Sequence, residues 1–181
     1  MCHSNRTNLP RRSRYSDSFI GGALRPLDRD KAEQELAVHL RKATSPEETS
    51  PKQKHVRKCI VYTWDHKSSQ SIWSGLRSLP IMNDDIQTFK ALIVVHKILQ
   101  EGHPVVLREA QSQMGWLDTC ARMSSTSPRN YSQLIQAYVS FIHAKLRFHR
   151  MHKEFNGLFE YEEYISLKNI DNPDEGYETI I

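Results

Sequence analysis

Four residues in the first third of the chain have types and a spacing that suit anion binding: Lys42, then Lys52 after nine intervening residues, then Lys54 and His55. Amines and protonated imidazoles attract phosphate, and the free N–H groups of a helix N-terminus add partial positive charge. A fan of cations around a small open space suits a multiply phosphorylated headgroup better than a long polyanion. Three further cations extend the cluster outward as a secondary basic patch or a partner interface: Arg41, Arg57 and Lys58.

The residues around the cluster indicate that it lies where two helices meet. Ser50 can act as an N-cap, Pro51 suits the first helical position, and Gln53 can close a capping box. The first turn of this helix would carry three of the four residues, and the fourth would come from the end of the preceding helix. At 100° per residue, their side chains would fan around the helix end. Lysines at a helix start are often plain surface residues, so their charge alone does not indicate a binding site. The predicted directions of their side chains around the helix end are what favour one.

Composition limits the class of protein. The 181 residues carry a net charge of +4 and are 38% hydrophobic, which suits one domain with a packed core. The chain has neither an apolar run of about 20 residues nor a signal-peptide pattern, so we expect a cytosolic protein. Residues 1–60 are basic and residues 154–181 acidic, which suggests that one pole faces an anionic surface. The scattered Cys2, Cys59 and Cys120 predict reduced thiols.

Apolar residues recur at helical spacing along most of the chain, and no strand pattern competes. Helices are predicted over about residues 28–45, 51–66, 69–79, 84–101, 105–111, 115–122 and 131–152, with a last one starting near Asp174. Residues 86–100 are apolar nearly all round and should form the central helix. Short links predict an all-α, α-solenoid-like curved stack of antiparallel helices over residues 28–181. Residues 1–27, with Gly-Gly and two prolines, are expected to form a flexible basic tail.

The spacing of the basic cluster resembles the phosphoinositide motif of ANTH domains, the N-terminal membrane-binding modules of endocytic clathrin adaptors. The resemblance covers roughly residues 28–181 and continues in order through HVRKCIVYTWDHKSS, LIVVHKILQEGHP, FEYEEY and NPDEGYETI. These segments look like the fungal members of the huntingtin-interacting-protein-related family, which link clathrin coats to actin. The resemblance implies a right-handed ENTH/ANTH stack and headgroup binding by Lys42, Lys52, Lys54 and His55. The Gly-Gly and prolines near the start depart from the inserted N-terminal helix of ENTH domains, so we expect binding by surface contact.

The same resemblance implies a function. The chain would recognise phosphatidylinositol 4,5-bisphosphate, recruit an endocytic adaptor to clathrin-coated pits, and co-assemble with an epsin-type ENTH domain. It would be cytoplasmic and peripheral on the plasma membrane, at coated pits and cortical actin patches. Clathrin and actin would be reached only through parts of a full-length adaptor that lie outside these residues. The alternative is a protein-interaction scaffold in which the basic patch is secondary.

Other functions are disfavoured by the sequence. Nucleic-acid binding is not expected, because no aromatic residues interleave the basic ones and the C-terminal end is acidic. The sequence has no Gly-rich phosphate loop and no recognisable setting for a catalytic nucleophile. Its nine histidines do not form a zinc-binding motif. We therefore expect neither catalysis nor a cofactor or metal.

Overall fold

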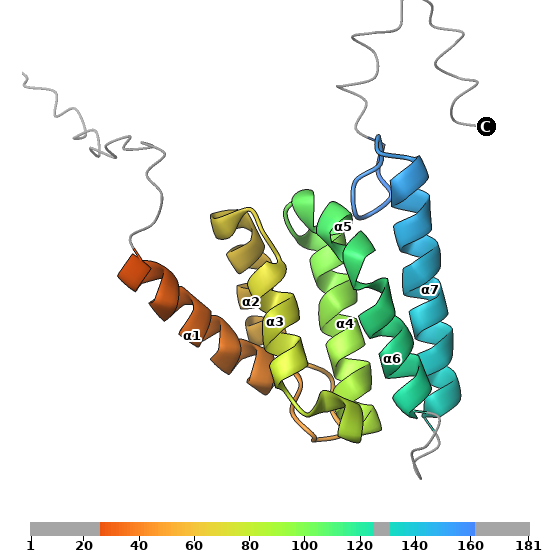
Figure 1. The fold of residues 1–181 in the computed structure, drawn as a ribbon, viewed down its shortest axis with the longest axis horizontal. Coiled ribbons are helices and arrows are strands. Elements are labelled where there is room, and N and C mark those ends of the chain that lie inside the picture. The colour runs from red at the N-terminus through yellow and green to blue at the C-terminus, as the bar shows by residue number, and fades with distance from the viewer. Residues whose placement is uncertain (1–25, 125–130, 162–181) are drawn as a thin grey trace, which may run out of the picture.

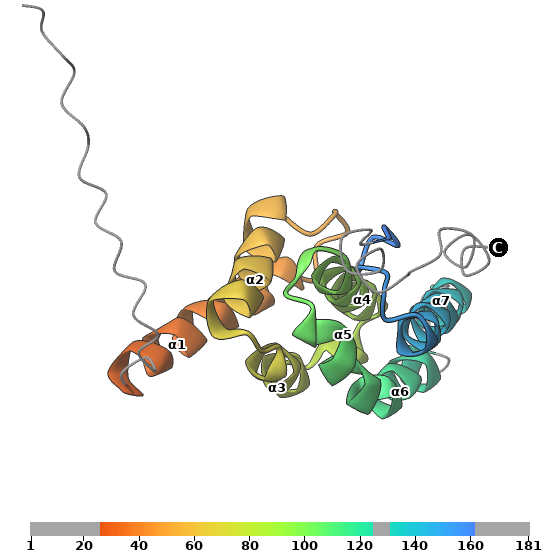
Figure 2. The same cartoon turned by 90° about the horizontal axis from the view of Figure 1, so that it is seen from above.

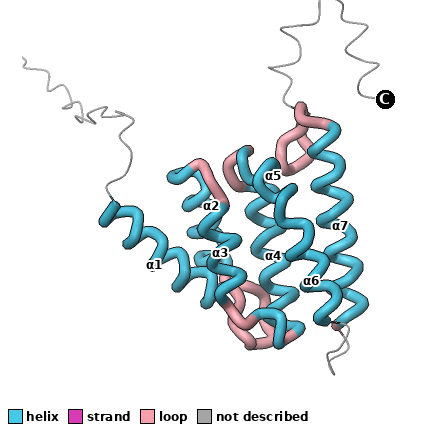
Figure 3. The backbone as a smooth tube through the Cα atoms, viewed as in Figure 1, coloured by secondary structure: helices cyan, strands magenta, loops and turns pink. Residues whose placement is uncertain are grey.

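The computed structural model describes residues 26–124 and 131–161, with side chains from Arg29 onward. The regular elements of these residues are helices, which follow one another in the order α1 (Pro26–Ala43), α2 (Gln53–His66), α3 (Gln70–Ser78), η1 (Ile81–Asn83), α4 (Asp85–Glu101), α5 (Val105–Ala110), η2 (Gln111–Gln113), α6 (Met114–Ser124) and α7 (Ser132–Met151). They stand side by side from α1 at one edge to α7 at the other, with the loops at the two ends (Figures 1 and 3). The predicted all-α stack of antiparallel helices is confirmed. The predicted N-terminal tail and the helix near Asp174 fall almost wholly outside the described residues.

Helix α4 is the centre of the stack, as its apolar sequence predicts. Seen from above, α2 and α3 lie on one side of it and α6 and α7 on the other (Figure 2). Asp84 caps its start by accepting hydrogen bonds from the amides of Ile86 and Gln87 at 2.8 and 3.3 Å. Gly102 follows its end, where a Cβ would lie 2.4 Å from the carbonyl oxygen of Ile98. A side chain at that position would therefore collide with the helix backbone.

Two local predictions are wrong. Helix α2 starts at Gln53, with Lys52 at the N-cap in an extended conformation and without a side-chain cap. Ser50 and Pro51 therefore lie in the preceding loop, and the predicted capping box is not formed. The helical spacing of apolar residues over 131–152 also predicts that Leu134 points inward, but Leu134 is 48% exposed. It lies on the outer face of α7, the last helix that the structure describes.

The two cysteines that the structure describes are free and buried, as predicted. Burial raises the pKa of both Cys59 and Cys120 to about 12, so both stay protonated and unreactive. Within the described ranges no group of His, Cys, Asp and Glu is arranged to hold a metal ion. None of the described helices has the length and apolar character that a membrane span needs.

Candidate functional site: the basic end of helices α1 and α2

Three exposed lysines meet where α1 ends and α2 begins. Lys42 is in the last turn of α1, Lys52 is the N-cap of α2, and Lys54 is in the first turn of α2. The charges of all three contribute to lowering the pKa of His55, so all three lie near its imidazole. The first turn of α2 contains no acidic residue. The structure thus brings together the three predicted lysines at a helix start, where positive charge is left unbalanced.

The fourth predicted residue, His55, does not fan outward with the lysines. Its side chain is buried against α1, with 6% of the residue exposed. The Nδ1 atoms of His55 and His39 lie 2.9 Å apart, so one ring donates a hydrogen bond and the other accepts it. Burial, then the charges of His39, Lys54, Lys42 and Lys52, lower the pKa of His55. His55 is therefore buried next to the three exposed lysines. The expectation that its side chain points outward with theirs is wrong.

The flanking cations remain separate from this cluster. Arg41, Arg57 and Lys58 are exposed, and none is among the charges that lower the pKa of His55. Arg57 and Lys58 follow His55 on α2, so they point to other sides of that helix. Each is next to or near a cluster residue in the sequence, and their role as a secondary basic patch or partner interface stays a prediction.

Two side chains from α4 hold the loop between α1 and α2. Lys90 is buried, and its Nζ donates to the Ser45 carbonyl oxygen at 2.9 Å, the Ser45 hydroxyl at 3.1 Å and the Glu47 carbonyl oxygen at 2.7 Å. The Nε2 of Gln87 donates to the carbonyl oxygen of Thr44 at 2.9 Å. The loop backbone between Lys42 and Lys52 is thus tied to the central helix. This support was not predicted from the sequence, although a lysine inside the most apolar segment of the chain was a signal for it.

A second contact holds the loop farther along. The hydroxyl of Tyr131, just before α7, donates to the carboxylate of Glu48. This contact joins the loop to the far side of the stack. The loop that separates Lys42 from Lys52 is therefore anchored by side chains of α4 and by the start of α7.

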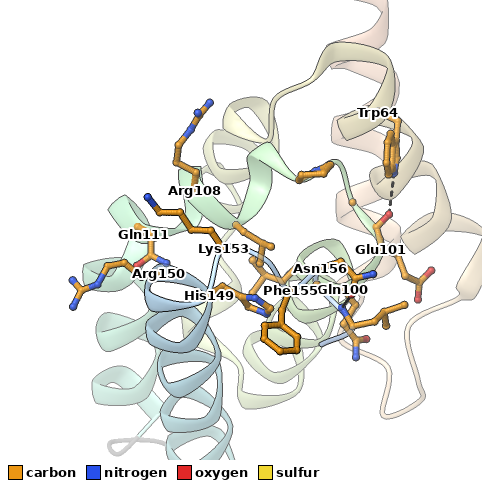
Figure 4. A pocket seen from close by; sticks show the side chains of 16 residues that line it. Trp64, Gln100, Glu101, Arg108, Gln111, His149, Arg150, Lys153, Phe155 and Asn156 are labelled. Carbon is orange, nitrogen blue, oxygen red and sulfur yellow. Dashed lines mark hydrogen bonds between the residues drawn. The ribbon is translucent and has the colours of Figure 1, made fainter. Parts of the chain in front are cut away.

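A pocket of about 630 Å³ lies at the other end of the stack and has no part in the basic cluster. Its walls come from the ends of α2, α4 and α7, from α5 and from the segment after α7, and include Trp64, Arg108, His149 and Phe155 (Figure 4). The indole Nε1 of Trp64 donates to the carbonyl oxygen of Glu101 at 2.9 Å. The basic cluster is therefore an exposed group of cations at one end of the stack, and the pocket at the opposite end is a separate feature.

A comparison with family models decides the family. The model of the ANTH domain matches residues 35–181. The chain belongs to the ANTH domain family. The resemblance drawn from its sequence motifs is thereby confirmed.

Curated relatives of this ANTH domain include an endocytosis protein. It is 50% identical over 155 residues to the endocytosis protein end4 of Schizosaccharomyces pombe, covering 84% of the chain and 14% of that protein. It is 52% identical over 152 residues to the protein SLA2 of Saccharomyces cerevisiae, covering 83% and 16%. A more distant relative, huntingtin-interacting protein 1 of Homo sapiens, is 30% identical over 138 residues, covering 76% and 13%. The chain thus spans about a sixth of the length of these relatives, or less.

Solved structures of similar chains share the fold. One belongs to the epsin-2 ENTH domain in complex with phosphatidylinositol 4,5-bisphosphate, with a TM-score of 0.75 and 62% identity over 87% of this chain and 61% of that one. Another belongs to the endocytic adaptor complex AENTH, with a TM-score of 0.71 and 52% identity over 82% and 60%. A third belongs to helical ANTH and ENTH tubules on membranes that contain the same lipid, with a TM-score of 0.61 and 52% identity over 81% and 55%. The predicted ENTH/ANTH fold is therefore confirmed.

Proposed function

We propose that this ANTH domain binds the headgroup of phosphatidylinositol 4,5-bisphosphate through Lys42, Lys52 and Lys54, with His55 beneath them. One observation carries the proposal: three exposed lysines lie near one buried imidazole at a helix start that has no acidic residue. Within the described residues none of the three lysines has a carboxylate partner. A phosphate would therefore meet three amines without first displacing an ion pair.

The size of the electrostatic gain suits reversible attachment. A basic residue near an anionic leaflet gains about 1 kcal/mol, so three lysines contribute roughly 3 kcal/mol before any specific hydrogen bond forms. Direct hydrogen bonds between ammonium groups and phosphate oxygens add to this. We infer a peripheral domain that is recruited where this lipid is concentrated and released when it is removed. Such an attachment is what an adaptor needs at an endocytic site on the plasma membrane.

The comparisons support a second part of the proposal. Similar chains occur in the AENTH complex and in tubules of ANTH and ENTH domains on membranes with this lipid. We propose that this domain also co-assembles with an epsin-type ENTH domain, with lipid at the contact and Arg57 at the edge that faces the partner. Lipid binding by this domain would recruit an endocytic adaptor to clathrin-coated pits, whereas links to clathrin and actin would involve other parts of a full-length adaptor.

Liposome sedimentation tests the lipid proposal. The domain is mixed with vesicles that contain phosphatidylinositol 4,5-bisphosphate, or with vesicles in which phosphatidylserine supplies the same total charge, at matched salt. We expect the domain to sediment with the bisphosphate vesicles and to remain mostly in solution with the others. Equal sedimentation with both would indicate general attraction to anionic lipid and would contradict headgroup recognition. Stronger binding to DNA or RNA at the same salt would favour the nucleic-acid alternative.

A mass measurement tests the co-assembly proposal. The domain and an epsin-type ENTH domain are mixed with and without a soluble form of the lipid, and the solution mass is recorded. A larger species that requires lipid is expected. If the two domains associate equally well without lipid, the proposed lipid contact between them is wrong.

A further inference from the structure

Lys90 is a buried cation at the centre of the fold, and the lipid proposal does not use it. Only 3% of the residue is exposed, although it carries an ammonium group. An ammonium has three N–H donors, and three acceptors surround this one: two carbonyl oxygens and one hydroxyl oxygen of the α1–α2 loop. A buried amine with every donor satisfied is a built feature, because burying it unpaired would cost several kcal/mol. The three acceptors come from Ser45 and Glu47, between the lysines of the basic cluster.

We propose that Lys90 is a positioning residue for the anion site: it fixes the loop that sets Lys42 and Lys52 at the distance a phosphorylated headgroup requires. The inference rests on the proposed function and deepens it. Nine residues separate the two lysines, and a free loop of that length would let their amines drift apart. A site that is already arranged loses less conformational entropy when its ligand binds. Lys90 would therefore raise affinity without touching lipid.

Gln87 provides an independent test of the same role. It lies one turn before Lys90 on α4, and its Nε2 holds the neighbouring carbonyl oxygen, that of Thr44. Gln87 is uncharged, so its removal loosens the loop without changing the electrostatic potential at the site. A purely electrostatic role for Lys90 would leave the affinity of a Gln87 variant unchanged.

The experiment compares three variants of the full chain: Lys90→Met, Gln87→Met and the control Lys97→Met. Lys97 is on the same helix and also carries one charge, but it is exposed and pairs with Glu101 at 3.2 Å at the other end. The readouts are the affinity for the soluble bisphosphate headgroup and amide hydrogen exchange of residues 44–52. We expect Lys90→Met to weaken headgroup binding about tenfold, the lower end of what loss of an orienting residue costs at metal sites. Gln87→Met should weaken it several-fold, both should speed exchange in the loop, and Lys97→Met should match the unmodified chain.

The outcomes separate this inference from the function on which it rests. Failure of the unmodified chain to bind the headgroup would contradict the proposed function itself. If the unmodified chain binds and Lys90→Met loses affinity while Gln87→Met does not, the positioning role of Lys90 is wrong. Its effect on binding would then be purely electrostatic. Unchanged affinity in both loop variants would overturn it as well. If Lys90→Met fails to fold, Gln87→Met and Lys90→Arg decide: positioning predicts a loss in the former and partial retention of binding in the latter.

Discussion

His39 and His55 face each other between α1 and α2, with their Nδ1 atoms 2.9 Å apart and their ring centres 5.1 Å apart. Only one proton fits between the two nitrogen atoms, so the pair keeps this hydrogen bond only while at least one Nδ1 is unprotonated. The three lysines of the cluster lie near His55, and burial, then the charges of His39 and of these lysines, lower the pKa of His55. The histidine pair is therefore expected to sense any anion that settles on the lysines.

This relationship predicts a pH dependence of lipid binding. A bound phosphate offsets the lysine charges, so the pKa of His55 rises on binding and the complex takes up a proton. Binding that raises a pKa is tighter at lower pH, so affinity should increase from pH 7.5 to pH 6. His55→Ala and His39→Ala should both flatten this slope. Affinity for bisphosphate liposomes across this pH range is the measurement.

The control for that slope is a histidine at the other end of the stack. Headgroup phosphates titrate in the same range, so only differences between variants are informative. His103→Ala, far from the lysines at the end of α4, should keep the unmodified slope. If His55→Ala and His39→Ala keep it too, the histidine pair does not sense the anion.

The stability of the fold should also depend on pH, with a defined sign. Burial, then the charge of Lys145, lowers the pKa of His149 to about 4, and the same causes lower that of His96 to about 4. Unfolded histidine titrates near 6.5, so on acidification the unfolded chain binds protons first. The stability that the two neutral histidines contribute should be fully present above about pH 7.5 and be lost as the pH falls from 6.5 to 4. The buried His149 alone should account for roughly 2–4 kcal/mol of that loss.

Urea unfolding at several pH values measures this loss. His149→Gln should reduce the slope of unfolding free energy against pH, whereas His152→Gln, on the exposed end of the same helix, should not. A slope that is the same in all three proteins would show that His149 is not held neutral by the fold.

Arg57 is expected to act on assembly more than on lipid. It is exposed on α2 beyond the lysine cluster, so it reaches a headgroup only at the edge of the site. Arg57→Ala should weaken liposome binding by the isolated domain within about tenfold, or 1.4 kcal/mol. Lipid-dependent assembly with an ENTH domain should suffer more, because a charge enclosed between two proteins and a phosphate interacts more strongly than one in water. Paired liposome and mass measurements check both effects.

Two outcomes would change this assignment. A loss of lipid binding as severe as removal of the central lysines would make Arg57 a headgroup ligand. Normal assembly in Arg57→Ala would remove it from the proposed interface.

Much of the fold could be predicted because its helix boundaries depend on local sequence. Pro46, Asp84 and Gly102 mark helix ends that the structure reproduces closely. The start of α2 was predicted less well. The sequence at Ser50 favours a helix start, but Gln87 and Lys90 of α4 hydrogen-bond to the loop before α2, and the helix begins later. Such tertiary contacts leave no signal within the loop itself.

The site was predictable to the extent that it consists of exposed side chains. The positions of Lys42, Lys52 and Lys54 follow once the end of α1 and the start of α2 are predicted approximately. The burial of His55 depends on which residue of α1 packs against it. The relative position of two packed helices cannot be predicted from the sequence pattern of either helix alone. Lys90 and Lys97 both interrupt the same apolar segment, and only the packing of α4 makes one buried and the other exposed.

The most direct test of the account removes the two lysines at the start of α2. Lys52→Ala/Lys54→Ala should abolish sedimentation with liposomes that contain phosphatidylinositol 4,5-bisphosphate and leave the helical circular dichroism unchanged, because exposed substitutions typically alter stability by less than about 0.5 kcal/mol. The control Lys31→Ala/Lys153→Ala removes the same charge from exposed positions away from the cluster and should bind normally. Undiminished binding by the Lys52/Lys54 variant, or an equal loss in the control, would contradict the assignment of the headgroup site.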